Sequence, residues 1–285
     1  MKYTVLSLFP EIVDAFVHSS IMAKAIERGI VEYQSVNIRD FAFDKHRTCD
    51  DAPYGGGAGM LMLVEPLSRA FESVGARNRF AESEQNESGQ CTKTGEANNV
   101  LKKSKKIYLT PSGRLFNQSL AVELVQEDEL VLLCGRYEGV DQRVVDAYID
   151  EEISVGDYVL SSGEAAAITV IDATYRLVDR VISPESLVEE SFTGGLLEYP
   201  QWTRPEIYGE LTVPDVLLSG HHENIRHWHL QKRVEKTLMV RPDLIKAGLK
   251  QGLFDAETRK IIKDSLKSME SDKIGIYGEI WRIIG

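Results

Sequence analysis

Apolar runs and helix-period segments alternate near the start of the chain. Residues 2–9 form a short β-rich apolar run before Pro10, and apolar positions recur at helical spacing over residues 12–28. Residues 36–38 suggest a second short strand, and residues 65–74 return to a helical period. This part of the chain is therefore predicted to form a strand, a helix, a strand and a helix.

Three similar strand-and-helix units follow. Residues 106–109 and 130–134 are continuous apolar runs, which are typical of strands buried on both faces. Residues 153–160 form a third strand-like run, and residues 165–178 form an apolar helical segment. Strands that alternate with helices predict an α/β fold with a parallel sheet.

Three segments do not follow this periodicity. Residues 39–60 are dense in charge, proline and glycine, so we expect a long loop of the kind that often carries function. Residues 78–104 hold almost no large apolar side chains, which predicts a disordered surface insertion. Periodicity also fades over residues 180–220 and returns as helical spacing from residue 223, which predicts a linker and a small helical C-terminal domain.

The composition narrows the class of protein. The 285 residues have a formal net charge of −11 and are 43% hydrophobic, which is typical of a globular chain and argues against indiscriminate binding of polyanions. No apolar run approaches the roughly 20 residues of a membrane-spanning helix. Cys49, Cys91 and Cys134 form neither a disulfide framework nor a C-x-x-C metal knuckle. We expect a cytoplasmic protein that neither spans a membrane nor is secreted.

Glycine-containing loops follow each of the three later strands. These are residues 110–114, 135–141 and 161–164, and in a parallel sheet such loops meet in the crevice beyond the carboxyl ends of the strands. Charged residues in these loops, such as Arg136 and Glu138, either tie the turn as an ion pair or serve a ligand. The sequence therefore predicts the ligand site at this edge of the sheet.

A further glycine-rich stretch lies at residues 55–60. It lacks both the P-loop pattern and the third glycine of the dinucleotide fingerprint, so it is either a flexible connector or a loop that approaches a ligand closely. Side chains beside it can contact phosphates and base edges, which favours the second interpretation. The candidate substrate-binding residues are Arg39, His46, Asp50, Tyr54, Gly55 and Gly59.

The C-terminal part of the chain carries a local basic and aromatic cluster. Residues 221–250 hold seven Lys and Arg against three Asp and Glu, and four of the six histidines lie beside Trp228. Such a cluster is typical of RNA binding, in which cations meet phosphates and aromatic rings stack on bases. A histidine metal site and a solvated helix face are the alternatives.

Several of these motifs together resemble the bacterial tRNA (guanine-N1)-methyltransferase family, TrmD. They are YGGGAGMLM at residues 54–62, GRYEGVD at 135–141 and VGDYVLS at 155–161, with residues 199–205 and 217–220. The resemblance implies a SPOUT-class α/β fold with a deep trefoil knot in residues 1–178, a linker over 179–200 and a helical tRNA-binding domain over 201–285. It also implies a homodimer that methylates N1 of the guanosine immediately 3′ of the anticodon.

The same resemblance implies S-adenosylmethionine as the methyl donor, bound by the three loops. By matching positions, the expected contacts are Leu109, Thr110, Pro111, Ser112, Gly113, Gly135, Arg136, Tyr137, Glu138, Val155, Gly156, Asp157, Tyr158, Val159, Leu160, Ser162, Gly163 and Ala166. Ser162 stands where the family usually has glycine. Dependence on Mg²⁺ is a further expectation from the family, although the sequence shows no metal cluster.

Methylation at guanine N1 requires a base, because N1 carries a proton at neutral pH, and a cation to stabilise charge on O6. By analogy with the family the cation is Arg176. The family base is the aspartate of a D-S-F triplet, and the matching triplet here begins at Glu190, with Glu189 as the neighbouring alternative. A glutamate carries one more methylene, which moves its carboxylate by on the order of 1 Å.

Two other classes of function stay open on the sequence alone. A non-catalytic RNA-binding relative of the knotted fold would keep the donor pocket but lack the base, and the glutamate at position 190 is its only support. A small-molecule α/β enzyme would leave the basic, histidine-rich tail unexplained. Binding of the donor without binding of tRNA would favour this last class.

Overall fold

The structure is a computed structural model that describes residues 1–80, 103–183, 190–268 and 275–284. The chain divides into two compact units, Met1–Ile182 and Ser183–Gly285. Most of the predicted insertion at residues 78–104 lies outside the described residues. Among the described helices, none combines the length and the apolar character that crossing a membrane would require.

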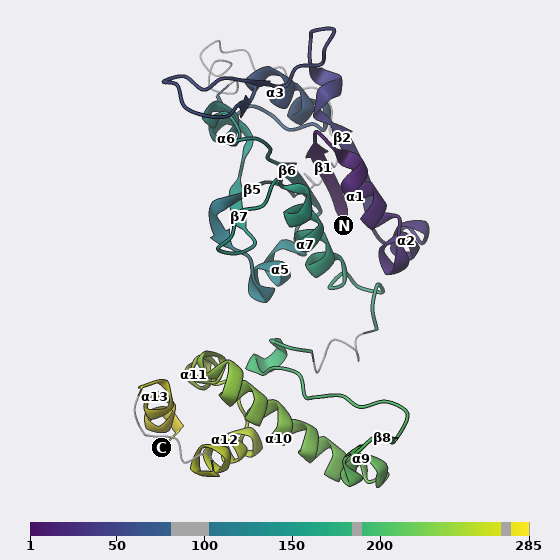
Figure 1. Cartoon of the computed structure of the whole chain (residues 1–285), viewed down its shortest axis with the longest axis vertical. Helices are drawn as coiled ribbons and strands as arrows, with labels where there is room; N and C mark the ends of the chain where they lie inside the picture. The colour runs from purple at the N-terminus through teal and green to yellow at the C-terminus, as the bar shows by residue number, and fades with distance from the viewer. Residues whose placement is uncertain (81–102, 184–189, 269–274, 285) are drawn as a thin grey trace, which may run out of the picture. The chain divides into compact units, whose positions relative to one another are not determined.

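The first unit is built on a five-stranded sheet in the order β2-β1-β6-β5-β7 (Figure 1). All neighbouring strands in it pair in parallel, which confirms the predicted α/β architecture. The strands are β1 Lys2–Ser7, β2 Glu32–Asn37, β5 Ser104–Leu115, β6 Glu129–Cys134 and β7 Glu151–Ser154.

Helices cover both faces of this sheet. One face is packed by α1 (Pro10–Val17), α2 (Ser20–Glu27), α5 (Gln118–Leu124) and α7 (Glu164–Tyr175). The other face carries α3 (Val64–Ser73), α6 (Gln142–Tyr148) and the 3-10 turn η1 (Ile38–Phe41). Residues along β6 alternate between the two cores, because successive side chains of a strand point to opposite faces. Strands buried on both sides therefore read as continuous apolar runs.

The structure corrects three of the predicted elements. The segment predicted as a loop at residues 110–114 continues β5, which runs to Leu115 and pairs again with β7 after an irregularity at residues 109–114. Residues 12–28 form two helices, because the hydroxyl of Ser19 donates to the Phe16 carbonyl (2.6 Å) at the end of α1 and Ser20 has a positive φ of 53°. The run at 153–160 is a strand only as far as Ser154. Its later apolar residues are exposed, with 87% of Val159 accessible, and they follow the sheet as a loop.

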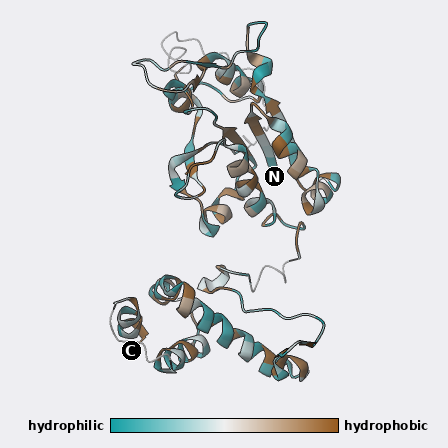
Figure 2. Ribbon diagram, viewed as in Figure 1, coloured by the Kyte–Doolittle hydropathy of each residue, from teal (hydrophilic) through white to brown (hydrophobic). Residues whose placement is uncertain are grey.

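The second unit is mainly helical. It contains α9 (Asp215–Leu218), α10 (His222–Val240), α11 (Pro242–Gln251), α12 (Ala256–Ser268) and α13 (Gly275–Ile284), with a short turn η2 (Thr193–Gly195) and a two-stranded ribbon of β8 (Ile207–Tyr208) and β9 (Leu211–Thr212). The helices enclose a small apolar core of their own. Figure 2 shows that α10 is largely hydrophilic, whereas the strands of the sheet are hydrophobic.

The carboxylate of Asp150 joins three segments at the amino end of β7. It accepts the Lys106 backbone N–H (2.8 Å) and pairs with the Lys106 ammonium (3.0 Å) and the Arg79 guanidinium (2.6 Å). Burial acts to raise the pKa of Asp150, but the bonds from Lys106 and Arg79 outweigh it and lower the pKa below its ordinary value. The folded state therefore favours the charged form of this carboxylate.

We expect Asp150→Asn to lower the free energy of unfolding at neutral pH by about 1 kcal/mol. Because the pKa of this carboxylate is lower in the folded state, its contribution is complete above the unfolded pKa, about 4, and is lost as the pH falls through the folded pKa. The difference between wild type and variant in urea denaturation should therefore shrink below pH 4. A difference that stays constant into acid would contradict this role.

Candidate active site

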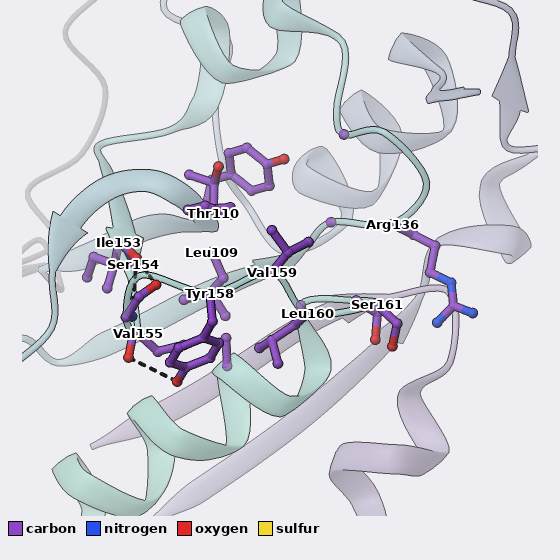
Figure 3. A pocket seen from close by; sticks show the side chains of 18 of the residues that line it. Leu109, Thr110, Arg136, Ile153, Ser154, Val155, Tyr158, Val159, Leu160 and Ser161 are labelled. Carbon is purple, nitrogen blue, oxygen red and sulfur yellow. Dashed lines mark hydrogen bonds between the residues drawn. The ribbon is translucent and has the colours of Figure 1, made fainter. Parts of the chain in front are cut away.

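A cavity of about 230 Å³ is enclosed by the middle of β5 and by the segments that follow β6 and β7 (Figure 3). The loops after β6 and β7 form two of its walls, as the sequence predicts for a parallel sheet. The third wall is Tyr108–Pro111, which lies inside β5 and not in a loop after it. Its lining consists of Tyr108, Leu109, Thr110, Pro111, Gly135, Arg136, Tyr137, Glu138, Gly139, Ile153, Ser154, Val155, Gly156, Tyr158, Val159, Leu160, Ser161, Ser162, Gly163 and Ala166.

Close contact between two of the loops shapes this cavity. The N–H of Gly163 donates to the carbonyl of Gly135 (2.9 Å). A Cβ on Gly163 would lie 2.7 Å from the Cα of Cys134, so only glycine lets the loop approach the end of β6 this closely. Since β5 lies between β6 and β7, the chain from β7 crosses the carboxyl end of β5 to reach this contact.

The walls combine apolar side chains with backbone polar groups. Figure 3 shows Tyr158, Val159 and Leu160 beside one another on the loop that follows β7, with the Tyr158 hydroxyl donating to the Val155 carbonyl (3.1 Å). Leu109 adds an apolar contact from β5. Small-molecule sites are typically built in this way, with apolar surfaces for a flat ring and a few polar groups for its edges. The cavity therefore suits a nucleoside.

The structure brings most of the expected donor contacts together in this one lining. Ser112, Gly113 and Asp157 are not part of it. The Ser112 hydroxyl instead donates to the Glu152 carboxylate (3.3 Å), and a Cβ on Gly113 would meet the Ile153 backbone N at 2.3 Å. Gly113 thus allows β5 to approach β7 closely.

Sequence reasoning did not single out five of the lining residues. They are Tyr108, Gly139, Ile153, Ser154 and Ser161. Gly139 and Ser161 lie inside the loops that the sequence predicts to hold the ligand. Tyr108, Ile153 and Ser154 are strand residues one or two positions before the expected contacts Leu109 and Val155, so extending those segments back into their strands would have found them.

The end of the glycine-rich segment at residues 54–62 is hydrogen-bonded through its backbone to the loop that follows β6. The Glu138 N–H donates to the Met60 carbonyl (3.0 Å), and the Met62 N–H donates to the Gly139 carbonyl (2.9 Å). Gly59 has a φ of +87°, and a Cβ there would overlap the Glu138 side chain. Residues 59–62 therefore lie against one wall of the cavity, as expected if this loop presents a substrate.

Two of the predicted substrate residues lie beside Tyr137 on this wall. Burial and then a hydrogen bond to Asp50 raise the pKa of the Tyr137 hydroxyl, while a hydrogen bond from Arg39 opposes the shift. Tyr137 itself has a φ of +59°, an uncommon conformation for a residue with a side chain. Arg39, Asp50 and Tyr137 thus form one polar group at the cavity.

The remaining substrate candidates lie further along the loop. Tyr54 is 98% exposed and lines a second cavity of about 690 Å³ together with Asp51 and Arg143. Gly55 follows it directly, and the His46 N–H is held by the Asp44 carboxylate (3.0 Å). These three residues are not part of the lining of the first cavity.

The two predicted catalytic residues lie in different units. Arg176 is the C-terminal cap of α7 in the first unit and is not among the residues that line the cavity. Glu190 opens a tight turn in the second unit, where its carbonyl accepts the Thr193 N–H (3.1 Å). The guanidinium of Arg233 holds this turn on α10 through the Thr193 carbonyl (3.1 Å). The alternative base Glu189 lies outside the described residues.

Aromatic and basic side chains gather along the middle of α10. His229 stacks on Tyr199 with a centroid distance of 3.6 Å, and Trp228 lies 5.3 Å from Trp202. The Lys232 ammonium lies 5.9 Å from the centroid of Trp228. In the part of the chain that the structure describes, no group of three or more His, Cys, Asp and Glu could hold a metal ion.

Residues 1–247 match the sequence profile of the family described as tRNA (Guanine-1)-methyltransferase TrmD. The chain belongs to the TrmD family. It is 56% identical over 264 residues to a tRNA (guanine-N(1)-)-methyltransferase of Treponema denticola, covering 93% of this chain and 98% of that protein. A Treponema pallidum protein of the same name is 48% identical (93% and 96% covered), and one of Borreliella burgdorferi is 52% identical over 246 residues (86% and 92% covered).

The motifs that carried the resemblance to this family lie at the cavity. The motifs that carried the resemblance, GRYEGVD and VGDYVLS, supply two of the cavity walls. The third motif, YGGGAGMLM, ends in the segment that pairs with the first. Motifs that are far apart in the sequence thus meet at one edge of the sheet.

Proposed function

We propose that this chain is an S-adenosylmethionine-dependent tRNA methyltransferase that modifies N1 of the guanosine immediately 3′ of the anticodon. The observation that carries the proposal is the cavity, which the family's own motifs enclose at the carboxyl edge of a parallel sheet. A nucleoside-sized site in a TrmD family chain suits a nucleoside methyl donor. The basic and aromatic cluster on α10 supports an RNA substrate.

The residues of the cavity fit this donor. Leu109, Val155 and Leu160 offer apolar surface for an adenine ring, and the backbone groups around Gly135 and Gly163 can approach its polar edge. When bound, S-adenosylmethionine supplies an electrophilic methyl group. Loops held by mutual backbone hydrogen bonds keep the site preorganised for it.

The chemistry at guanine N1 then depends on two side chains of the protein. The carboxylate of Glu190 accepts the N1 proton, which makes N1 nucleophilic. The guanidinium of Arg176 stabilises the negative charge that develops on O6. The target base must leave the stack of the anticodon loop to reach these groups.

Assembly and topology complete the proposal. We place the reaction in a homodimer, in which the site combines the cavity of one subunit with Glu190 of the other, as the family resemblance implies. We also infer the family's deep trefoil knot, and the crossing of the chain over the end of β5 supports it.

Buried free thiols at Cys49 and Cys134 support a reducing compartment such as the cytoplasm. Mg²⁺ dependence stays a family-based expectation.

A transcript-based assay tests the proposed reaction. Purified protein is incubated with S-adenosylmethionine and an unmodified tRNA transcript that carries guanosine 3′ of the anticodon, with the same transcript carrying adenosine there as the control. We expect 1-methylguanosine by mass spectrometry on the first transcript alone. Binding of donor and tRNA without any product would instead indicate a non-catalytic relative.

A further inference from the structure

Arg39 and Arg136 both approach the ring of Phe9. Their guanidinium carbons lie 5.6 Å and 4.8 Å from the ring centroid. Both arginines are half-buried, and neither forms an ion pair with any residue that the structure describes. The Asp50 carboxylate reaches Arg39 only through the Tyr137 hydroxyl, so one carboxylate stands against two partly desolvated cations, and the π face of the ring offsets only part of the remaining cost. The arrangement therefore suits an anion from outside the chain.

The position of Phe9 is coupled to the donor cavity. The Phe9 N–H donates to the Ser7 hydroxyl (2.8 Å), and that hydroxyl donates to the Glu164 carboxylate (2.5 Å). Ser7 and Glu164 are both buried, and Glu164 directly follows Gly163 in the cavity wall. The ring is thus held by the same helix terminus that shapes the cavity.

The side chain of Arg136 is directed away from the interior of the cavity. Figure 3 shows its guanidinium pointing away from Tyr158, Val155 and Thr110, so its backbone lines the cavity while its charge lies to one side. Arg39 comes from η1, and it meets Tyr137 at the cavity wall. The two cations therefore flank the site where a substrate approaches.

We propose that Arg39 and Arg136, positioned by Phe9, bind a backbone phosphate of the RNA beside the target nucleotide. This inference rests on the proposed function, because tRNA is the polyanion that the reaction brings to this side of the cavity. Guanidinium groups suit phosphate, since their N–H donors match its oxygens in paired hydrogen bonds. Phosphate contacts of this kind fix the register of a nucleic acid on a protein. Here they hold the extruded nucleotide in front of the donor.

Salt-dependent tRNA binding tests this site in the full-length chain. We expect Arg39→Ala and Arg136→Ala each to raise the Kd for the tRNA transcript about tenfold. Each variant should also lower the slope of log Kd against log salt concentration, and the double variant should lower it by about 0.7 to 0.9, the value for one phosphate contact. Phe9→Leu should raise the Kd for tRNA several-fold, because it keeps apolar bulk but removes the π face. The Kd for S-adenosylmethionine, measured by calorimetry, should stay unchanged in Arg39→Ala, because Arg39 is not part of the cavity lining.

Matched variants separate this role from loss of folding. Arg114→Ala removes an arginine that is already paired with Glu123 (3.0 Å) and Glu151 (3.2 Å), so it should leave the salt slope as in wild type. Arg136→Lys keeps the charge and should restore most of the slope. Thermal melts establish that each variant is folded before its binding is compared.

Three results would overturn the phosphate site. They are an unchanged salt slope in folded Arg39→Ala and Arg136→Ala, a slope that Arg114→Ala lowers equally, and a weaker Kd for S-adenosylmethionine in place of tRNA. The last result would assign the guanidinium of Arg136 to the donor carboxylate. Failure of the proposed function looks different, since wild type would then bind tRNA with the full slope but form no 1-methylguanosine.

Discussion

Glu190→Gln is expected to lower the single-turnover rate constant of methyl transfer by about 10² to 10⁴. The amide cannot accept the N1 proton, so guanine stays a poor nucleophile even when tRNA and donor are bound. The Kd for S-adenosylmethionine should not change, because the turn that begins at Glu190 belongs to the second unit and the cavity to the first. Rapid-quench kinetics with excess enzyme measures the chemical step directly.

Three variants make this prediction specific. Glu190→Asp restores the family's own residue and keeps a carboxylate that can accept the proton, so it should be far more active than Glu190→Gln, although a shift of the carboxylate by on the order of 1 Å can lower its rate. Glu206→Gln changes another carboxylate of the second unit, one that is exposed, and should have no effect. A normal rate constant in Glu190→Gln, together with a large loss of rate in Glu189→Gln, would assign the general base to Glu189 instead.

Gly163→Ala is expected to raise the Kd for S-adenosylmethionine about ten- to a hundredfold, as overpacking costs about 1 to 3 kcal/mol. The new methyl group would lie 2.7 Å from the Cα of Cys134 and 2.8 Å from the N of Gly135. These are backbone atoms that no rotamer change can move aside. The loop after β7 must therefore shift away from the loop after β6, which widens the cavity between them.

A second glycine variant gives the control for Gly163→Ala. Gly252 has a φ of +69° but open space around its Cα, so Gly252→Ala strains the backbone of the second unit without a clash. We expect it to cost about 1 kcal/mol of stability and to leave donor binding intact. Isothermal titration of both variants with S-adenosylmethionine compares them. Equal donor affinity in Gly163→Ala and wild type would show that the contact does not shape the site.

The parallel sheet could be predicted because its signal is local. Strands buried on both faces need apolar side chains in both directions, so residues 130–134 of β6 read as an unbroken apolar run. Local signals were insufficient at residues 12–28 and 153–160. There the spacing of apolar residues hid a helix break at Ser19 and an exposed loop after Ser154. Exposed apolar residues of a ligand site and buried ones of a strand give the same pattern.

The candidate site was predictable in part for the same reason. Glycines directly after buried strands mark the carboxyl edge of a parallel sheet, and the structure places residues from all three loops around one cavity there. Arg176 and Glu190 could not be found in this way, since neither follows a strand. Only the family resemblance pointed to them, and they stay predictions that the kinetics above would test.

The sequence by itself determined the α/β class, the edge of the sheet where the loops meet and the membership of the TrmD family. These follow from periodicity and from ordered motifs, which are properties of neighbouring residues. The tertiary structure decided the contact of Gly163 with Gly135 and the meeting of Arg39 and Arg136 at Phe9. Such contacts join residues far apart along the chain, and they depend on backbone approach and side-chain direction, which no local pattern encodes.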